Sequence, residues 1–403
     1  MRIKKGVLVL INSKNLREDV EEIIELSKNI NIEIVEYIHQ NLNKPDPLTF
    51  IGKGKFEDLK ELIAFVDAEV LVINSELSPR QYIHISKELN IEVYDRTDVI
   101  LKIFSEHAET QESKLQIKLA TLKHILPRIY GLGSEMSRTG GGIGTRGPGE
   151  QEKEYKKRTI KNEISKIQNK LKKIKSQREL TRKNKKDIIK VSIVGYASAG
   201  KSTLLKELSH ENKIKISEKM FSTLSPKSRR VMLPSGLFVI LSDTVGFIRN
   251  LPHELIEAFK STLEEIKYSD LIIHLVDISS QNIEERISTA YDVLENIKAL
   301  DIPRILVFNK IDKINDEQLS ILKNRYKNAI FISCKTGENI ENLKKAIQDK
   351  LIEEEIIKTF EIEEEYKNVQ NWFKKRGKIG IEEITFNNTD IKLKIYARNG
   401  GAL

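Results

Sequence analysis

Cysteine is nearly absent from this chain: Cys334 is the only one among 403 residues. A single cysteine excludes an internal disulfide and a zinc site built from cysteines, and we expect Cys334 to be a small buried residue. No apolar run approaches the ~18 residues that a membrane-spanning helix needs. The first apolar stretch, Gly6 to Ile11, is shorter than the ~7–15-residue core of a secretion signal and predicts a buried strand. We therefore expect a cytoplasmic protein without a membrane span, and the length allows about two to three domains.

Positive charge is concentrated in one segment. Residues 151–190 hold 16 Lys or Arg and 5 Asp or Glu, a net charge of +11, whereas the whole chain carries +9. A basic segment on a nearly neutral body indicates a polyanionic partner, because each phosphate that a protein neutralises releases counterions. A solvated helical linker explains the same charge run equally well, so composition leaves both interpretations open.

The first third of the chain alternates short apolar runs with stretches of helical periodicity. Continuous apolar runs separated by helices of ~10 residues predict parallel strands joined by helical crossovers. We predict an N-terminal α/β subdomain with a small parallel sheet over residues 1–97. Its strands are Val7–Ile11, Ile34–Tyr37, Val70–Ile73 and Val93–Tyr94, and its helices are Asp19–Lys28, Phe56–Phe65 and Pro79–Leu89.

A long helical hairpin is predicted over residues 98–187. Helical periodicity extends from Asp98 to Tyr130, and Pro127 is expected to end the helix. Six glycines in residues 140–149 exclude a regular helix or strand there, and a flexible interdomain linker would also explain them. The second helix, Glu152–Leu180, has apolar residues at heptad-like spacing, which predicts packing on a partner helix. The two apolar stripes are Leu115, Leu119, Leu122 and Leu126, and Ile160, Ile164, Ile167, Leu171 and Ile174.

A phosphate-binding loop follows the next predicted strand, Ile189–Val194, and precedes a predicted helix, Thr203–Leu208. In its pattern, GxxxxGK[ST], glycines let backbone N–H groups converge on phosphate oxygens at a helix N-terminus. Lys201 is expected to reach the β- and γ-phosphates, and the Ser202 hydroxyl to ligate magnesium. The expected binding segment comprises Gly195, Tyr196, Ala197, Ser198, Ala199, Gly200, Lys201, Ser202 and Thr203.

Two further segments are expected on the phosphate side. Asp243 follows the predicted strand Leu237–Leu241, where a carboxylate can hold magnesium through a water. The Gly246 N–H can face the γ-phosphate, so the segment Asp243, Thr244, Val245 and Gly246 is assigned to the nucleotide. A first-switch threonine adds its hydroxyl to magnesium in such domains. In the segment Phe221, Ser222 and Thr223 the candidate is Thr223, and Ser222 is its nearest competitor.

The remaining segments indicate guanine. Asn309 directly follows the predicted strand Ile305–Phe308, and Asp312 lies three residues after Asn309. The Asp312 carboxylate can accept hydrogen bonds from the N1–H and the N2 amino group of guanine. Adenine presents neither donor, so a buried Asp312 would be left unpaired at a cost of ~1–3 kcal/mol or more. Asn309 is expected to brace the phosphate loop, and Lys310 to lie along the base. After the predicted strand Ile330–Ile332, the N–H groups of Ser333, Cys334 and Lys335 are expected to read the guanine O6.

Four elements in this order, each after a strand, predict a guanine-nucleotide switch domain over residues 188–352. Its expected ligands are GTP or GDP and Mg²⁺, and its expected reaction is hydrolysis of GTP. Directly after Gly246, many GTPases carry a glutamine that orients the attacking water, whereas this chain has Phe247. No catalytic side chain is predicted, and slow intrinsic hydrolysis is expected. Packing of Phe247 on the core is compatible with this interpretation.

Further segments carry information beyond these motifs. They are Asp243 to Leu255, Phe221 to Pro226, the loop end Gly144 to Glu150, and the shorter Phe50 to Lys55, Glu76 to Pro79, Asp95 to Thr97 and Leu126 to Arg128. Through these segments the chain resembles the HflX-type GTPases of the Obg–HflX branch over about residues 1–350. Asp243 to Leu255 is similar to the second switch of that family almost residue for residue, Phe221 to Pro226 is similar to its first switch, and Gly144 to Glu150 is the most diagnostic segment.

The resemblance implies an N-terminal α/β subdomain, a helical hairpin and a Ras-like P-loop GTPase domain. It also implies binding to the large ribosomal subunit and its RNA, with splitting or rescue of ribosomes. The chain departs from the family after Glu150 and at Ser198, where an asparagine linked to potassium-assisted hydrolysis is common. We expect a monomer that does not bind DNA.

The tail over residues 353–403 is predicted to be a small α+β segment. Its expected elements are a helix at Tyr366–Lys375 and strands at Ile379–Phe386 and Ile391–Tyr396. For the whole chain, three functions compete. The first is a ribosome-associated GTPase whose nucleotide state controls docking of the basic hairpin. The second is a nucleotide-regulated RNA-binding module that acts on free RNA or stress granule-like assemblies rather than on intact ribosomes. The third is a P-loop ATPase, which Asp312 disfavours.

Overall fold

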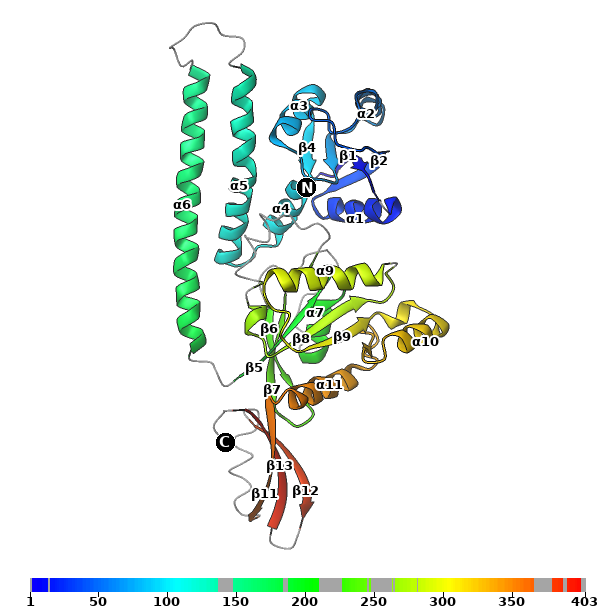
Figure 1. Ribbon diagram of the computed structural model, residues 1–403, viewed down its shortest axis with the longest axis vertical. Coiled ribbons are helices and arrows are strands. Elements are labelled where there is room, and N and C mark those ends of the chain that lie inside the picture. Colours follow the sequence, from blue (N-terminus) through cyan, green and yellow to red (C-terminus); the bar gives the residue numbers. More distant parts are fainter. Residues whose placement is uncertain are drawn as a thin grey trace. The chain divides into compact units, whose positions relative to one another are not determined.

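The computed structural model describes residues 2–13, 15–136, 148–183, 188–209, 227–244, 246–247, 263, 265–280, 282–365, 379–386 and 390–399. Of these residues, those up to Lys175 form one compact unit, and those from Ser176 onward form a second. Figure 1 labels their helices and strands. Among the described residues, no helix combines the length and the apolar character that crossing a membrane requires.

A four-stranded parallel sheet lies at the centre of the first unit. Its strands are ordered β2 (Ile32–Gln40), β1 (Lys4–Ile11), β3 (Val70–Ile73) and β4 (Glu92–Asp95). The apolar side chains of β3 are at most 1% exposed, as expected for a strand covered on both faces. Helices α1 (Leu16–Asn29), α2 (Lys53–Val66) and α3 (Pro79–Leu89) connect the strands. The alternation predicted for the first third of the chain is confirmed.

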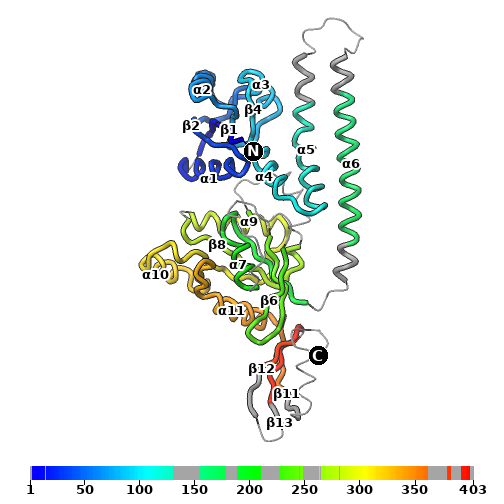
Figure 2. Tube along the Cα trace, turned by 180° about the vertical axis from the view of Figure 1, so that it is seen from behind, coloured from blue at the N-terminus to red at the C-terminus, as the bar shows by residue number. Residues whose placement is uncertain are grey.

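The predicted helical hairpin is also present. Helix α5 (Gln111–Met136) and helix α6 (Pro148–Lys183) run antiparallel and side by side over the part of α6 that belongs to the first unit (Figures 1 and 2). Lys118 of α5 pairs with Glu163 of α6, and Ile167 in the predicted stripe is 4% exposed. Residues 140–147 of the predicted glycine-rich loop lie outside the described residues.

The helical segment before that loop is two helices rather than one. Helix α4 (Arg96–His107) ends at Ala108, which has an extended conformation with φ −72° and ψ 104°. Two residues later, Thr110 starts α5, because its Oγ1 accepts a hydrogen bond from the backbone N–H of Ser113.

The prediction that Pro127 ends the helix is wrong, since α5 continues through it to Met136. A proline removes one backbone hydrogen bond from a helix. Here the turn around it is held by side chains: Arg128 donates to Asp95 at 2.7 Å, and His124 lies 3.3 Å from the same carboxylate. These tertiary contacts compensate for the missing helical hydrogen bond.

The second unit is built on a six-stranded sheet. Among the strands that the structure describes in this sheet, only β6 is antiparallel to its neighbour. The carboxyl ends of the parallel strands therefore lie at one edge, where ligands bind in open α/β sheets. The order is β10 (Ile330–Phe331), β9 (Arg304–Asn309), β8 (Leu271–Asp277), β5 (Ile189–Gly195), β7 (Phe238–Asp243) and β6 (Lys227–Met232). Its helices are α7 (Lys201–Ser209), α9 (Ile283–Asn296), α10 (Asp316–Arg325) and α11 (Ile340–Glu353).

A three-stranded antiparallel sheet follows, in the order β11 (Ile357–Glu365), β13 (Asp390–Arg398) and β12 (Gly380–Phe386). Strands β12 and β13 match the prediction, whereas β11 was not predicted. Its acidic residues are not typical of a strand, and the strand forms because it pairs with β13. The predicted helix at Tyr366–Lys375 lies outside the described residues.

This small sheet is anchored to the six-stranded sheet by polar contacts. The guanidinium of Arg398 donates to both carboxylate oxygens of Asp270, at 2.7 and 3.0 Å. The Ile381 N–H donates to the carbonyl of Ser235, and Gly380 passes so close that a Cβ would lie 2.7 Å from the Ser235 hydroxyl. The turn between β6 and β7 is therefore held by the C-terminal sheet.

A neutral histidine lies in the core of the second unit. His274 in β8 is 1% exposed, and its ring meets that of Tyr291 edge-on at 5.8 Å. Burial, together with the charge of Arg304, lowers the pKa of His274 to about 4.

We expect this histidine to weaken the second unit in acid. The unfolded chain takes up a proton near the ordinary histidine pKa of ~6.5, whereas the folded chain does so only near 4, so stability falls as the pH drops between these values. His274→Leu removes the titrating group. Its thermal midpoint, followed by circular dichroism, should drop less than that of the wild type between about pH 7 and 5. An equal drop in both proteins would contradict the assignment.

Candidate nucleotide-binding site

The loop between β5 and α7 has a backbone that only certain residues can adopt. Gly195 and Gly200 have φ values of 155° and 96°. A Cβ at Gly195 would lie 2.1 Å from the carbonyl oxygen of Leu275, and one at Gly200 would lie 2.3 Å from Nδ2 of Asn309. Ser198 also has a positive φ of 64°, a region that asparagine enters more easily than serine. The two glycines of the motif are therefore required for close packing of the loop.

Lys201 lies beneath this loop. Its side chain is buried, and its Nζ donates to the carbonyls of Gly195 at 3.1 Å and Tyr196 at 2.9 Å. Burial lowers the pKa of Lys201 to about 8, although the carboxylate of Asp243 acts in the opposite direction. The ammonium group is thus held at the loop by backbone oxygens, and an added anion would favour its charged form.

Ser202 and Asp243 bring oxygen atoms together at the start of α7 and the end of β7. The Ser202 hydroxyl donates to Oδ2 of Asp243 at 2.6 Å, and Asp243 is fully buried. The Thr244 hydroxyl donates to the carbonyl of Ile193 at 2.7 Å, which fixes the end of β7 against β5. Hydroxyl and carboxylate oxygens are the ligands that Mg²⁺ prefers, so this pair fits the expected magnesium site.

Phe247 pairs with the phosphate-binding loop through its backbone. Its N–H donates to the Gly195 carbonyl at 3.0 Å, and its carbonyl accepts from the Ala197 N–H at 2.8 Å. The residue is 2% exposed, which confirms the interpretation of Phe247 as a core residue. A Cβ at Gly246 would lie 2.9 Å from Cα of Ala197, so a side chain there would collide with the loop.

Asn309, at the end of β9, joins two loops. Its Nδ2 donates to the Ala199 carbonyl at 2.8 Å, and its Oδ1 accepts from the Cys334 N–H at 3.0 Å. This is the expected brace on the phosphate loop. Cys334 is buried, and burial raises the pKa of its thiol to about 12, so it is the small buried residue that was predicted.

Asp312 differs from the prediction in its surroundings. Its side chain is exposed, whereas the argument for guanine assumed that it was buried. The Ser333 hydroxyl donates to Oδ1 of Asp312 at 2.6 Å and accepts from the Thr336 N–H at 3.2 Å, which orients the carboxylate. Leaving the Asp312 carboxylate without a hydrogen-bond donor therefore costs binding free energy only when a bound base covers it and excludes water. Lys335 is exposed beside this loop.

Sequence reasoning missed Asp277 at the same edge of the sheet. Its Oδ2 accepts from Lys310 Nζ at 2.6 Å, and its Oδ1 accepts from the N–H and the hydroxyl of Ser279. Burial alone would raise the pKa of the Asp277 carboxyl, but Lys310 and Ser279 hold it below its ordinary value. The signal was available, because Asp277, like Asp243, is an acidic residue that ends a buried parallel strand.

Some predicted residues cannot be placed. Phe221, Ser222, Thr223 and Val245 lie outside the described residues. Thr203 lies in the first turn of α7, directly after the lysine and serine of the motif.

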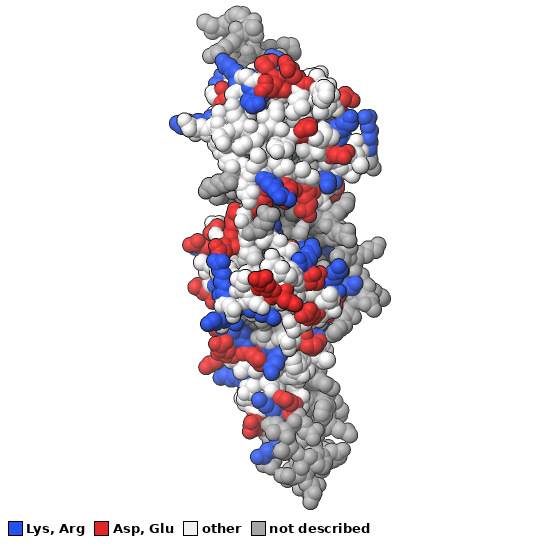
Figure 3. Space-filling model, turned by 90° about the vertical axis from the view of Figure 1, so that its right-hand side faces the viewer, with Lys and Arg blue, Asp and Glu red and all other residues white. Residues whose placement is uncertain are grey.

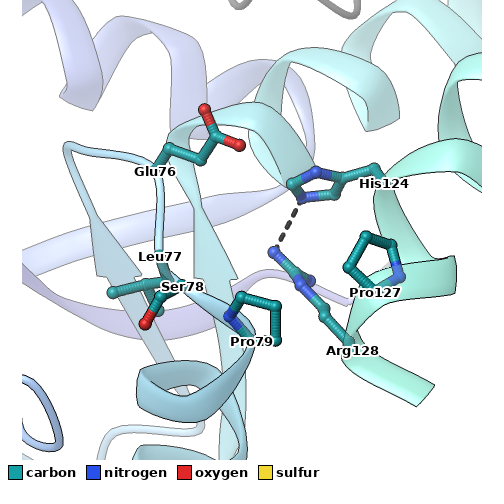
Figure 4. A pocket seen from close by; sticks show the side chains of 7 residues that line it. All are labelled: Glu76, Leu77, Ser78, Pro79, His124, Pro127 and Arg128. Atoms are coloured by element: carbon teal, nitrogen blue, oxygen red, sulfur yellow. Dashed lines mark hydrogen bonds between the residues drawn. The ribbon is translucent and has the colours of Figure 1, made fainter. Parts of the chain in front are cut away.

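A separate polar pocket lies in the first unit, where two of the family-like segments meet (Figure 4). The cavity measures about 380 Å³, and Glu76 to Pro79 face His124, Pro127 and Arg128 across it. Asp95, Asp98 and His124 are spaced as metal ligands could be. However, the guanidinium of Arg128 already lies against both carboxylates, at 2.7 and 2.8 Å. Burial lowers the pKa of His124, but its hydrogen bonds to Asp95 and Asp98 raise it to about 10. Two positive side chains therefore balance the two carboxylates and tie α5 to β4.

Comparisons with known proteins match most of the chain. Three family models match it: "GTP-binding GTPase N-terminal" over residues 17–105, "GTP-binding GTPase Middle Region" over 107–185 and "50S ribosome-binding GTPase" over 190–310. The GTPase HflX of Caldanaerobacter subterraneus subsp. tengcongensis is 40% identical over 97% of this chain and 91% of that protein. The chain belongs to the HflX GTPase family. GTPase HflX of Lacrimispora saccharolytica is 42% identical, over 85% of this chain and 82% of that protein.

A solved structure extends the match to the fold. The crystal structure of an SsGBP and GDP complex has a TM-score of 0.51 and 28% identity, over 87% of this chain and 99% of that chain. The predicted fold is confirmed: a parallel α/β region, a helical region, a P-loop GTPase domain and a small C-terminal sheet. As an HflX GTPase, the chain hydrolyses GTP, and its cofactors are GTP or GDP and Mg²⁺.

Proposed function

We propose that this HflX GTPase binds the large ribosomal subunit through the basic helix α6, and that its nucleotide state controls docking so that it splits or rescues ribosomes. The observation that carries the proposal is the charge of this helix. Lys170, Lys172, Lys173 and Lys175 of α6 are exposed, and residues 151–190, which include most of the helix, carry a net charge of +11. On the face drawn in Figure 3, by comparison, basic and acidic side chains are interspersed. The family model that matches residues 190–310, "50S ribosome-binding GTPase", supports the same partner.

In the proposed nucleotide site, the backbone of residues 195–203 and the side chain of Lys201 hold the phosphates. Ser202 and Thr223 would ligate Mg²⁺ directly, and Asp243 would do so through a water. The ion, when bound, supplies positive charge against the charge that develops on the phosphates. Asp312 would read the base edge, and Ser333, Cys334 and Lys335 would offer N–H groups to its O6. The four domain limits, the cytoplasmic location, the monomeric state and the lack of a DNA partner stay predictions.

Guanine selectivity should depend on Asp312. Asp312→Asn replaces an acceptor by a donor, so GTP binding should collapse, whereas xanthine nucleotides, which offer a carbonyl at that position, should gain affinity. Titration of fluorescent GDP and XDP analogues measures both effects. Unchanged affinity for GDP would show that Asp312 does not read the base.

Ribosome binding should weaken steeply with salt, because α6 would neutralise several phosphates. Reversal of Lys170, Lys172, Lys173 and Lys175 to Glu should flatten the salt dependence of co-sedimentation with large subunits and leave GDP affinity intact. A matched control reverses four exposed lysines elsewhere in the first unit, Lys28, Lys44, Lys53 and Lys87.

Two outcomes of this experiment would contradict the proposal. If the α6 variant binds large subunits normally across the salt series, α6 is a linker. If the wild type sediments equally well with naked ribosomal RNA and with subunits, whether GTP or GDP is present, the protein is an RNA-binding module.

Intrinsic GTP hydrolysis should be slow. Phe247 cannot orient a water, and its side chain is buried, so the large subunit is expected to accelerate hydrolysis by ~10²–10⁵-fold. Single-turnover assays of the protein alone and with large subunits test this. Ser202→Ala serves as a control that should lose hydrolysis under both conditions. Fast hydrolysis by the isolated protein, unaffected by ribosomes, would contradict the expectation.

A further inference from the structure

We propose that Asp277 is a positioning residue for the nucleotide base, which it holds indirectly by fixing the side chain of Lys310. The proposal rests on the proposed nucleotide site, in which Lys310 lies along the base. Asp277 does not belong to any of the nucleotide motifs recognised in the sequence. Asp277 would act only through Lys310. Removal of the Asp277 carboxylate should therefore weaken nucleotide affinity and leave the rate of phosphate hydrolysis unchanged.

The backbone places the two residues beside each other. Asp277 ends β8 and is paired in register with Asn309 at the end of β9, and the Ile278 N–H donates to the Asn309 carbonyl at 3.0 Å. Directly after this pair, Lys310 adopts a left-handed conformation with φ 69°. A non-glycine residue in this region is uncommon and persists where surrounding contacts hold it. The ion pair with Asp277 is such a contact.

The ion pair is short and partly shielded from water. Oδ2 of Asp277 lies 2.6 Å from Nζ of Lys310, and the two side chains are 11% and 23% exposed. The other carboxylate oxygen accepts from the N–H and the hydroxyl of Ser279, at 3.0 and 2.7 Å, so the carboxylate cannot rotate away. A partly buried pair of this kind is sensitive to the removal of one partner.

Lysine is a flexible side chain, and fixing it on binding costs free energy. A lysine whose end is already held loses less conformational entropy when a base packs along its stem. Asp277 therefore preorganises one wall of the base site. Because GTP and GDP share the base, both should lose the same factor in affinity without Asp277, whereas the phosphate contacts of residues 195–203 should not change.

The first experiment compares Asp277→Asn with Ser279→Ala. Asparagine keeps the shape and can still accept from Ser279, but it loses the charge that holds Lys310. We expect roughly tenfold weaker binding of both GDP and GTP, equal within error, and an unchanged single-turnover hydrolysis rate at saturating GTP. Ser279→Ala, which leaves the ion pair in place, should stay within about twofold of the wild type. A loss confined to GTP, or a fall in the saturated rate, would overturn the proposal.

A double-mutant cycle tests whether Asp277 acts through Lys310. In a Lys310→Met background, Asp277→Asn should have no further effect on GDP affinity, and additive losses would overturn the proposal. Lys310→Arg tests the ion pair without a change at Asp277, so it remains informative if Asp277→Asn does not fold at the assay temperature. The arginine retains a cation for the carboxylate, so Lys310→Arg should bind GDP much more tightly than Lys310→Met does. Equal losses in the two Lys310 variants would also overturn it.

Failure of this inference can be told apart from failure of the base-site assignment. If Asp312→Asn leaves GDP affinity unchanged, the assignment itself is wrong. If Asp312→Asn abolishes binding and Asp277→Asn binds GDP as the wild type does, only the role of Asp277 is wrong.

Discussion

The loops at the carboxyl edge of the six-stranded sheet depend on the buried side-chain amide of Asn309. It donates to the loop after β5 and accepts from the loop after β10, so one side chain at the end of β9 holds these two loops together. An amide is suited to this because it carries a donor and an acceptor on one rigid plane. A carboxylate or an aliphatic side chain would leave a buried backbone group unpaired, at a cost of about 1–3 kcal/mol. The close approach of Asn309 also explains why position 200 must be glycine.

Buried charges around this amide are arranged for an anionic ligand. Lys201 is held by two backbone carbonyls, and its lowered pKa shows that burial opposes its charge. Phosphate groups nearby would reverse that effect. Asp243 accepts from the Ser202 hydroxyl, and its charge partly offsets the effect of burial on Lys201. At the ends of β8 and β9, Asp277 and Lys310 neutralise each other, whereas the carboxylate of Asp312 is exposed and accepts a hydrogen bond from the Ser333 hydroxyl.

The first unit follows a different physical logic. Its charged cluster pairs Asp95 and Asp98 with Arg128 and His124 and connects β4 and α4 with α5. Segments that are far apart in the sequence, and that resemble the HflX family, meet at this cluster. Two of its residues, His124 and Arg128, flank the proline that α5 tolerates. The same cluster fixes helix α5 of the hairpin to β4 and α4, and the exposed lysines lie along the second helix of the hairpin, α6.

Local sequence patterns alone predict the strand–helix alternation of the two α/β regions, the phosphate loop, the carboxylate of Asp243 at the end of a strand, the contact of Asn309 with the phosphate loop, and the family. These patterns are apolar runs, glycine spacing and polar residues that end strands. Contacts in the folded chain were needed to show that α5 continues past Pro127, that β11 is a strand, that Asp312 is exposed and that Asp277 holds Lys310. Each of these depends on a partner distant in the chain, because Arg128 needs Asp95, β11 needs β13, and the ends of β8 and β9 meet only when the sheet forms.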